Sequence, residues 1–429
     1  MKAENSLLTQ LAETENLTNA WNLLNKDNED SYGLSGQSIK DFDQNLASNI
    51  ESISKELKAN TFRFSPTRAA VIKKDNGKYR PLQIPEIRDR IVLKALSTLL
   101  EEQFSETLYK SDKISFAYQR GKGVREAVLQ MKSLYQKGGK VILKADIINF
   151  FEEVQKDKLL KEQIYPNLSD NSINQLIRAS MSQRLGGLNR LKKEHKLLFK
   201  NAGYGIPQGN PLSPLLSNIY LSKFDLYLKK LDYSVIRYAD DFIVVFKSEE
   251  EANKGYEEIN KFLNEELSLK IHSLETKNGK TEIINPTEKE LSFLSIKFDG
   301  NNIYPGKDTL GILKSRIKSV IKTGELNSLL YQEIYDVVEK WIALYSYTDI
   351  ERYFDEIDLY LTVQLTKKFG NQQYKTIKCK KLTRKVRNKQ YNKSTKSIWR
   401  NRDLAKILPK FFRIQKKQPL THAYGSLAG

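Results

Sequence analysis

Three aspartates are the residues in this sequence best suited to chemistry. Asp240 and Asp241 are adjacent, and Asp146 precedes them by about 94 residues. Each follows an apolar stretch, where unpaired carboxylates lower stability because neighbouring like charges repel. A hard divalent cation resolves this conflict, and Mg²⁺ needs only a few carboxylates together with substrate phosphates. The three aspartates therefore predict a magnesium site, and a solvent-exposed Asp-Asp turn is the alternative interpretation.

Other kinds of metal centre find little support in the composition. Cys379 is the only cysteine, so a disulfide within the chain and a cysteine-based zinc site are excluded. His195, His272 and His422 are widely spaced and form no HExxH pattern. Carboxylates therefore remain as the metal ligands to consider.

Positive charge is concentrated near the C-terminus. The 429 residues carry a net charge of +19, and residues 366–418 contain 19 Lys and Arg residues against one acid, Asp403. The rest of the chain is nearly neutral, with a net charge of +1. This distribution predicts a segment that holds a polyanion, and a solvated charged tail is the alternative.

The elements that position the aspartates can be predicted from the apolar spacing. Val141–Ala145 is expected to be a buried strand that ends at Asp146. Val235–Tyr238 and Phe242–Phe246 are expected to form a hairpin whose tip carries the other two aspartates. Helices are expected at about 155–195, 213–230 and 250–267, which gives an α+β or α/β arrangement.

A second hairpin is expected earlier in the chain, and helical segments are expected at the N-terminus and after the last strands. Ala69–Lys74 and Tyr79–Ile84 are predicted strands joined by a turn that contains Gly77. The first 64 residues are predicted to be mainly helical, and Leu310–Phe369 a helical bundle. Basic residues line the rim of the upstream hairpin: Arg68, Lys73, Lys74, Lys78 and Arg80.

Motifs around these residues resemble the reverse transcriptase family. Tyr238-Ala239-Asp240-Asp241 resembles its catalytic box, GIPQGNPLSP at 205–214 the preceding box, and KADIINFF at 144–151 its first palm motif. Arg80-Pro81-Leu82 and RDRIV at 88–92 resemble the fingers motif of the lineage that includes group II intron enzymes. Leu294-Ser295 departs from the usual Leu-Gly of a later motif. The resemblance covers about residues 17–365, in order.

This resemblance implies an α+β, right-hand polymerase fold with fingers, a palm containing an antiparallel sheet, and a helical thumb. The expected division is an N-terminal helical extension (1–64), fingers (65–140), the first part of the palm (141–160), an insertion between fingers and palm (161–204), the second part of the palm (205–304), the thumb (305–365) and a basic, mainly helical C-terminal RNA-binding region (366–429).

The resemblance also assigns roles to individual residues. Asp146, Asp240 and Asp241, with Ile147, would hold two Mg²⁺ ions, for which Mn²⁺ could substitute. The residues implied for the incoming deoxynucleotide are Arg80 with Lys73 or Lys74 on its triphosphate, Gln208 on its sugar and the template base, Phe151 as a steric gate against ribose, and Lys277 in a later palm motif. The residues expected to contact nucleic acid in the basic region are Arg384, Lys385, Arg387, Trp399, Arg400 and Arg402. A core phenylalanine and a surface charge are the alternatives for Phe151 and Arg80.

The implied activity is copying of an RNA template into DNA from deoxynucleotides. No endonuclease, Cys-rich or RNase H motif follows the predicted thumb, and the box after Gln208-Gly209 differs from those of retron and diversity-generating enzymes. The sequence therefore resembles a stand-alone antiphage defence enzyme that copies a dedicated non-coding RNA. A group II intron maturase without its endonuclease, and an RNA-binding protein on a polymerase scaffold, are the alternatives.

Location can be predicted from hydropathy. No apolar run reaches the roughly 18 residues that span a bilayer, and the first residues lack the apolar core of a signal peptide. We therefore expect a cytoplasmic protein without a membrane partner, which could be an oligomer.

Overall fold

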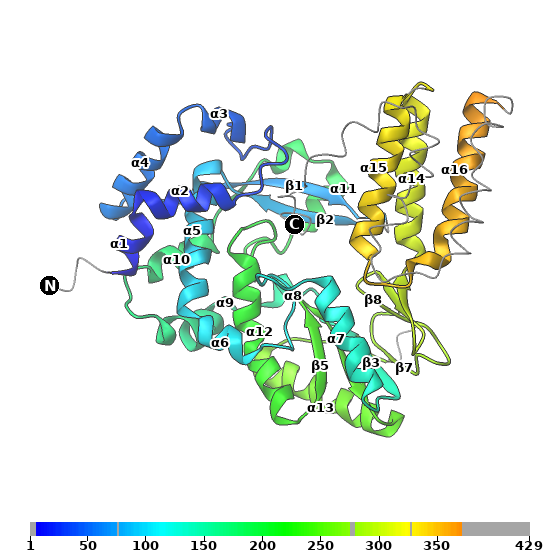
Figure 1. Ribbon diagram of the computed structural model, residues 1–429. Helices are drawn as coiled ribbons and strands as arrows, with labels where there is room; N and C mark the ends of the chain where they lie inside the picture. Colours follow the sequence, from blue (N-terminus) through cyan, green and yellow to red (C-terminus); the bar gives the residue numbers. More distant parts are fainter. Residues whose placement is uncertain (1–5, 75–76, 275–278, 327, 371–429) are drawn as a thin grey trace. The chain divides into compact units, whose positions relative to one another are not determined.

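The computed structural model describes residues 6–74, 77–274, 279–326 and 328–370 (Figure 1). Lys277 and the six predicted RNA-contacting residues of the basic region lie outside these ranges. The chain divides into two compact units, Met1–Ile283 and Ile284–Gly429. No helix among the described residues is long and apolar enough to cross a membrane.

Short helices open the first unit, as the apolar spacing predicts. They are α1 (Leu7–Ala12), α2 (Thr14–Leu23), α3 (Ile39–Asp43) and α4 (Leu46–Lys58). Helix α2 packs against the long helix α5 (Ile87–Gln103), which leads into α6 (Ser105–Lys110) (Figure 1). Leu17 and Trp21 are buried in this contact region, so the N-terminal helices share one core with the following elements.

The upstream hairpin forms as expected and gains a third strand. Strands β1 (Thr67–Lys73) and β2 (Tyr79–Ile84) pair antiparallel, and β4 (Leu185–Gly186) adds to β1 in parallel. Helices do not fill 155–195 as expected, because Pro166 and the Gly186-Gly187 pair interrupt this segment, and Gly187 takes a positive φ of 76°. The segment instead contains α9 (Lys156–Lys158), a π-helical turn (Leu159–Ile164), α10 (Asn174–Ser180), β4 and α11 (Lys193–Lys196).

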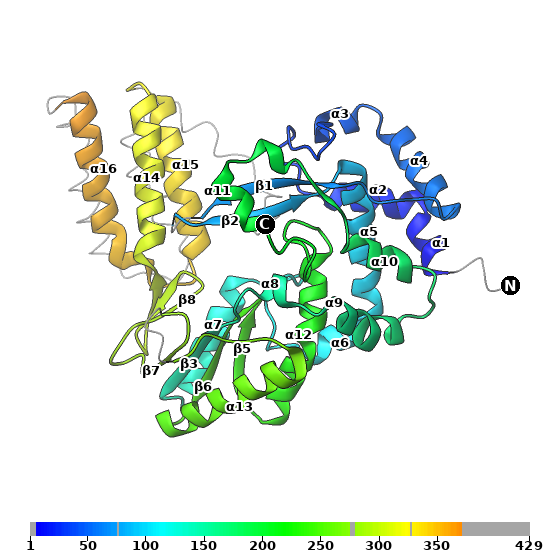
Figure 2. The same cartoon turned by 180° about the vertical axis from the view of Figure 1, so that it is seen from behind.

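A four-stranded sheet forms the centre of the first unit. Its strand order is β5 (Ser234–Tyr238), β6 (Asp241–Phe246), β3 (Val141–Asp146) and β7 (Glu282–Ile284). Helices α7 (Val124–Gln136) and α13 (Glu249–Leu267) pack on these strands, and α12 (Ser213–Lys230) lies beside them (Figure 2). Consecutive residues such as Phe242, Ile243 and Val244 are fully buried, which shows that the sheet is covered on both faces.

The second unit combines a small sheet with a three-helix bundle. The sheet contains β8 (Leu291–Phe293), β9 (Ile296–Phe298) and β10 (Ile303–Pro305); the bundle contains α14 (Lys307–Thr323), α15 (Ser328–Tyr345) and α16 (Phe354–Phe369). The strand signal past Phe298 is too short to recognise from the sequence, and β10 was not predicted.

The bundle is predicted correctly, but part of its seam is not. The helical spacing of the sequence predicts a seam that includes Leu329 and Leu344, but these side chains are 64% and 54% exposed. Leu330 and Val338 of the same helix are buried instead. Adjacent apolar residues lie about 100° apart on a helix, so a shift of one position places the wrong residue in the core.

Candidate active site

A two-residue turn carries Asp240. Tyr238 of β5 pairs with Asp241 of β6, so Ala239 and Asp240 alone connect the two strands. Ala239 has a φ of +57°, the backbone conformation that glycine usually supplies at the first central position of a type II′ turn. An alanine in this conformation is strained, so the surrounding structure must hold the turn.

Arg237 provides that support from within the strand. Its side chain is fully buried and makes a bidentate ion pair with Asp225 of α12. Nε lies 2.7 Å from Oδ1 of Asp225, and Nη2 lies 2.6 Å from Oδ2. Nη1 donates hydrogen bonds to the carbonyl oxygen of Ala239 (3.0 Å) and to Oδ1 of Asn218 (3.2 Å). A buried charge is tolerated when its donors are satisfied in this way. Arg237 therefore fixes the turn to α12.

Strand pairing brings the distant aspartate to the same place. Asp146, the last residue of β3, lies directly opposite Asp241 in the antiparallel register. Burial, followed by the charges of Asp146 and Asp240, raises the pKa of Asp241 to about 7. Burial and the charge of Asp146 also raise the pKa of Asp240. The three carboxylates thus repel one another at one end of the sheet and favour a cation between them.

Lys280 supplies a positive charge at this point. Its ammonium group contacts the Asp146 carboxylate. Burial opposes the charge of Lys280, but the hydrogen bond that Lys280 donates to Asp146 and the charges of the three aspartates raise its pKa overall. Lys280 was not predicted from the sequence, where its only signal is its place three residues after Lys277, which lies outside the described residues.

The carboxylates offer Mg²⁺ a suitable set of hard oxygen donors. Among the described residues no three His, Cys, Asp or Glu side chains already gather around a common metal position. The ammonium group of Lys280 instead offsets the charge of Asp146, and the Lys280 side chain is 53% exposed. Ile147 is buried, and its amide donates to the Asp240 carbonyl oxygen at 3.3 Å. The three carboxylates therefore fit the predicted cation, and this hydrogen bond holds the Ile147 backbone beside Asp240.

The β1–β2 hairpin brings basic side chains to the carboxylates. Burial and the positive charge of Arg80 lower the pKa of Lys74, and the charges of Asp240 and Asp146 oppose that shift, so these groups share one electrostatic environment. Lys73 pairs with Tyr79, and successive residues of a strand face opposite sides. The structure therefore groups Lys74 with Arg80 and directs Lys73 to the other face.

The loop before α12 joins the hairpin to the end of β3. The amide of Ile206 donates to the Phe151 carbonyl oxygen (2.8 Å), and the amide of Gln83 donates to the Gln208 carbonyl oxygen (2.8 Å). Gly205 has a φ of +57°, and a Cβ there would lie 1.9 Å from the Phe151 carbonyl oxygen, so only glycine fits. The loop therefore links the Phe151 segment, which follows β3 in the chain, to strand β2 through Gln208.

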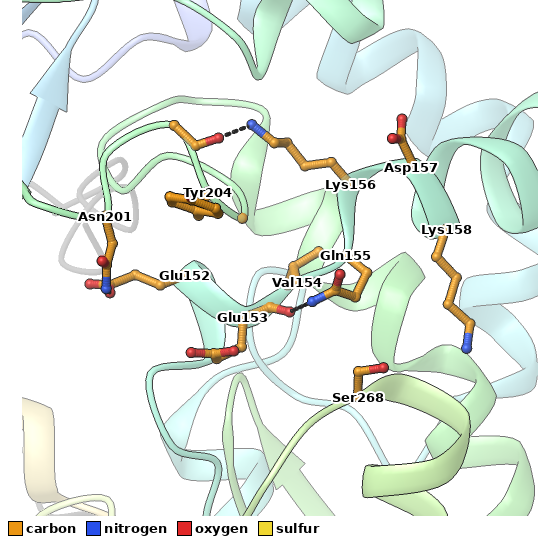
Figure 3. Close-up of a pocket in the computed structure, with 12 residues that line it drawn as sticks. Glu152, Glu153, Val154, Gln155, Lys156, Asp157, Lys158, Asn201, Tyr204 and Ser268 are labelled. Atoms are coloured by element: carbon orange, nitrogen blue, oxygen red, sulfur yellow. Dashed lines mark hydrogen bonds between the residues drawn. The ribbon is translucent and has the colours of Figure 1, made fainter.

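A hollow of about 710 Å³ lies next to this loop (Figure 3). It is lined by residues 152–158, 201, 203–205 and 268, and none of the three aspartates is among them. Lys156 donates to the Met181 carbonyl oxygen (3.3 Å) and also contacts the Gly203 carbonyl, which ties the two walls together. The hollow adjoins the Phe151 segment and is separate from the carboxylate site.

The central antiparallel sheet ends in three carboxylates near the basic β1–β2 hairpin, and the fold is the right-hand polymerase fold that was expected. Residues 72–298, more than half of the chain, match the family described as "Reverse transcriptase (RNA-dependent DNA polymerase)". The chain belongs to this family.

Individual relatives agree with that assignment. Protein YkfC of Escherichia coli K12 is 30% identical over 200 residues, which cover 46% of this chain and 49% of YkfC. The group II intron-encoded protein LtrA of Lactococcus lactis is 28% identical over 183 residues, 42% of this chain and 28% of LtrA. Retron Ec83 reverse transcriptase of Escherichia coli is 29% identical over 130 residues, 29% and 36% of the two chains. The matched part thus spans about half or less of each relative.

Proposed function

We propose that the protein is an RNA-directed DNA polymerase that adds deoxynucleotides to a primer on an RNA template. The observation that carries the proposal is the register that sets Asp146 opposite Asp241, one residue from Asp240 at the turn. Membership of the reverse transcriptase family supports the same activity.

The chain's own residues suit each part of this reaction. Asp146, Asp240 and Asp241 would hold two Mg²⁺ ions, and the chemistry these supply when bound is activation of the primer 3′-hydroxyl and neutralisation of charge on the triphosphate. Arg80 and Lys74 would bind the triphosphate from the hairpin, because both reach the electrostatic environment of the aspartates. On the β3 side, Gln208 would orient the sugar and Phe151 would exclude a 2′-hydroxyl.

Primer extension with Asp240→Asn and Asp241→Asn tests the assignment. Each change removes a carboxylate from the metal site, which weakens transition-state charge stabilisation by several kcal/mol and lowers the rate by orders of magnitude. The matched control is Asp232→Asn, an exposed aspartate in the loop that precedes β5. We expect full activity for the control and RNA binding that is intact in all three variants. Normal extension by the two active-site variants in Mg²⁺ would refute the assignment.

We infer a biological role only from the sequence resemblance. The template in this proposal is a dedicated non-coding RNA, the role is antiphage defence, and the enzyme works in the cytoplasm. The similarity to LtrA makes an intron RNA the second candidate template. Sequencing the RNA and the complementary DNA that copurify with the protein distinguishes them: a short structured transcript supports the defence role, and an intron supports the second candidate.

A further inference from the structure

The loop between α6 and α7 extends the edge of the central sheet beside β5. The amide of Arg237 donates to the Ile114 carbonyl oxygen (2.7 Å), and the amide of Phe116 donates to the Arg237 carbonyl oxygen (3.0 Å). Ser115 and Arg237 form a parallel bridge. The loop is thus fixed to the strand that leads into the Asp240 turn.

The same contacts hold Tyr118 near the Asp240 turn. Tyr118 follows the Ser115–Arg237 bridge by three residues in the loop, and the charge of Asp240 acts on its hydroxyl. Asn218 strengthens this alignment, because its Nδ2 donates to the Ala117 carbonyl oxygen (2.9 Å) while its Oδ1 accepts from Arg237. The same buried cluster therefore fixes both the loop and the catalytic turn.

Tyr118 has features that core packing does not explain. Its side chain is 48% exposed, and its backbone takes a φ of +59°, a strained conformation for a residue other than glycine. Its hydroxyl has no hydrogen-bond partner among the described residues. Burial and then the charges of Asp240 and Tyr238 raise the pKa of Tyr118, and the nearby charge of Arg80 opposes this shift, so the ring is neutral at pH 7. Strain of this kind gathers at functional sites.

We propose that Tyr118 contacts the terminal base pair of the primer–template duplex. This inference rests on the proposed polymerase function, since the primer 3′-hydroxyl must approach Asp240 and its partners for the reaction to occur. A flat, neutral phenol suits a base or sugar better than a triphosphate, for which the cations Arg80 and Lys74 are suited.

The layout of the site favours the terminal base pair over the incoming nucleotide. Phe151 follows β3 in the chain, whereas the loop that carries Tyr118 is bonded to β5, and β6 lies between these two strands. The incoming sugar belongs on the β3 side in the proposed function. We therefore place the primer–template duplex on the β5 side of the sheet.

Three full-length variants test this inference. Tyr118→Ala removes the ring, Tyr118→Phe removes only the hydroxyl, and Tyr109→Ala removes a tyrosine on α6 that is 76% exposed. The measurements are the Kd for an RNA-template–DNA-primer duplex, the KM for deoxynucleotide, and the melting temperature as a check of folding. We expect Tyr118→Ala to weaken duplex binding by about 5- to 100-fold, which corresponds to one aromatic contact. Tyr118→Phe should retain most of the affinity, Tyr109→Ala all of it, and the KM should change by less than about twofold.

Two outcomes would overturn the inference. Unchanged duplex affinity in Tyr118→Ala would show that the ring does not contact the duplex. A raised KM for deoxynucleotide with normal duplex affinity would assign the ring to the incoming nucleotide. The two proposals are tested by different measurements. Normal activity in Asp240→Asn would refute the polymerase assignment, whereas duplex affinity in Tyr118→Ala tests only the contact of Tyr118 with the duplex.

Discussion

At the scale of single residues, Asp89 of α5 is a carboxyl group with no exposure to solvent. Its Oδ2 accepts hydrogen bonds from the amide of Ser65 (2.8 Å) and from Nε2 of Gln183 (3.3 Å), while Oδ1 has no partner among the described residues. Burial raises the pKa of Asp89 to about 7, against the opposing effect of the Ser65 hydrogen bond. The group therefore joins the start of β1 to α5 in its neutral form.

This shift predicts a pH-dependent effect of Asp89→Asn. Between about pH 4 and 7 the folded protein holds a proton on Asp89 that the unfolded chain releases, so the contribution of Asp89 to stability falls as pH rises. Asparagine has no such titration. We expect the variant's stability relative to the parent to rise by a few kcal/mol from pH 4.5 to pH 8, as measured by urea unfolding. Exposed Asp30→Asn is the control, and a difference independent of pH would contradict the prediction.

Phe151 offers a second test at the residue scale. Replacement by Ala or Val should open space beside the sugar and improve ribonucleotide use by about tenfold or more, equivalent to 1.4 kcal/mol of lost discrimination. Deoxynucleotide incorporation should continue, because a steric clash is removed and no hydrogen bond is lost. Phe151→Tyr keeps the ring and should keep the selectivity. Steady-state incorporation of each nucleotide type measures it, and unchanged selectivity in an active Ala variant would indicate core packing alone.

At the scale of elements, the β8–β9 hairpin shows why Leu294-Ser295 is unusual. Phe293 pairs with Ile296, so these two residues form the whole connection, with φ values of 51° and 63°. Two positive φ angles are typical of a type I′ turn, where glycine is favoured. The Ser295 carbonyl oxygen accepts a hydrogen bond from the Gly306 amide (2.8 Å), which fixes the turn against the start of α14.

The strained turn predicts that Ser295→Gly is stabilising. Relief of about 1–2 kcal/mol of left-handed strain exceeds the entropy that glycine adds to the unfolded chain, so a net gain of about 0.5–1 kcal/mol is expected. Ser292→Gly, in the adjacent extended strand, is the matched control and should destabilise by about 0.5–1 kcal/mol. Denaturant midpoints of the full-length proteins report both effects, and equal shifts in the two variants would argue against strain at the turn.

At the scale of the whole molecule, the helical bundle extends into the predicted basic region. Helix α16 runs to Phe369, and Lys368 Nζ donates to the carbonyl oxygens of Ile321 (2.6 Å) and Lys322 (2.9 Å) at the end of α14. Lys368 therefore belongs to the bundle, beyond the boundary at residue 365 that was expected. A truncation that keeps the bundle must end after Gly370.

That truncation tests the basic segment. Residues 371–418 contain 17 Lys and Arg residues and one acid. Each phosphate that they neutralise on a single strand contributes about −0.7 to the slope of log affinity against log salt. If a third of these cations bind phosphate, removal should flatten the slope by about 4 and weaken template binding. RNA affinity across a salt series measures this, after melting shows that the truncated protein is folded. Equal slopes would assign RNA binding to residues before 371.

The sequence by itself determined the local features of this protein. The motif around Asp240, the apolar strands on either side of it and the β1–β2 hairpin depend on residues close together in the chain, where strand alternation and turn residues act directly. The apolar strands predicted that the three aspartates lie at strand ends, and the resemblance of the motifs implied the polymerase fold. The apolar spacing gave wrong predictions in two places. Helices do not fill 155–195, and in α15 the residue next to the predicted one is buried.

The tertiary structure decided which residues surround the aspartates. Four contacts there join residues far apart in the chain. They are the pairing of Asp146 with Asp241, the ammonium group of Lys280 beside Asp146, the hydrogen bonds of Arg237, and the bridge that holds the Tyr118 loop. In the sequence, Arg237 is a lone charge in an apolar strand and Tyr118 one tyrosine among 22. Their positions depend on strand pairing and burial, because only partners that folding brings together can hold a charge in a core or a ring beside the Asp240 turn.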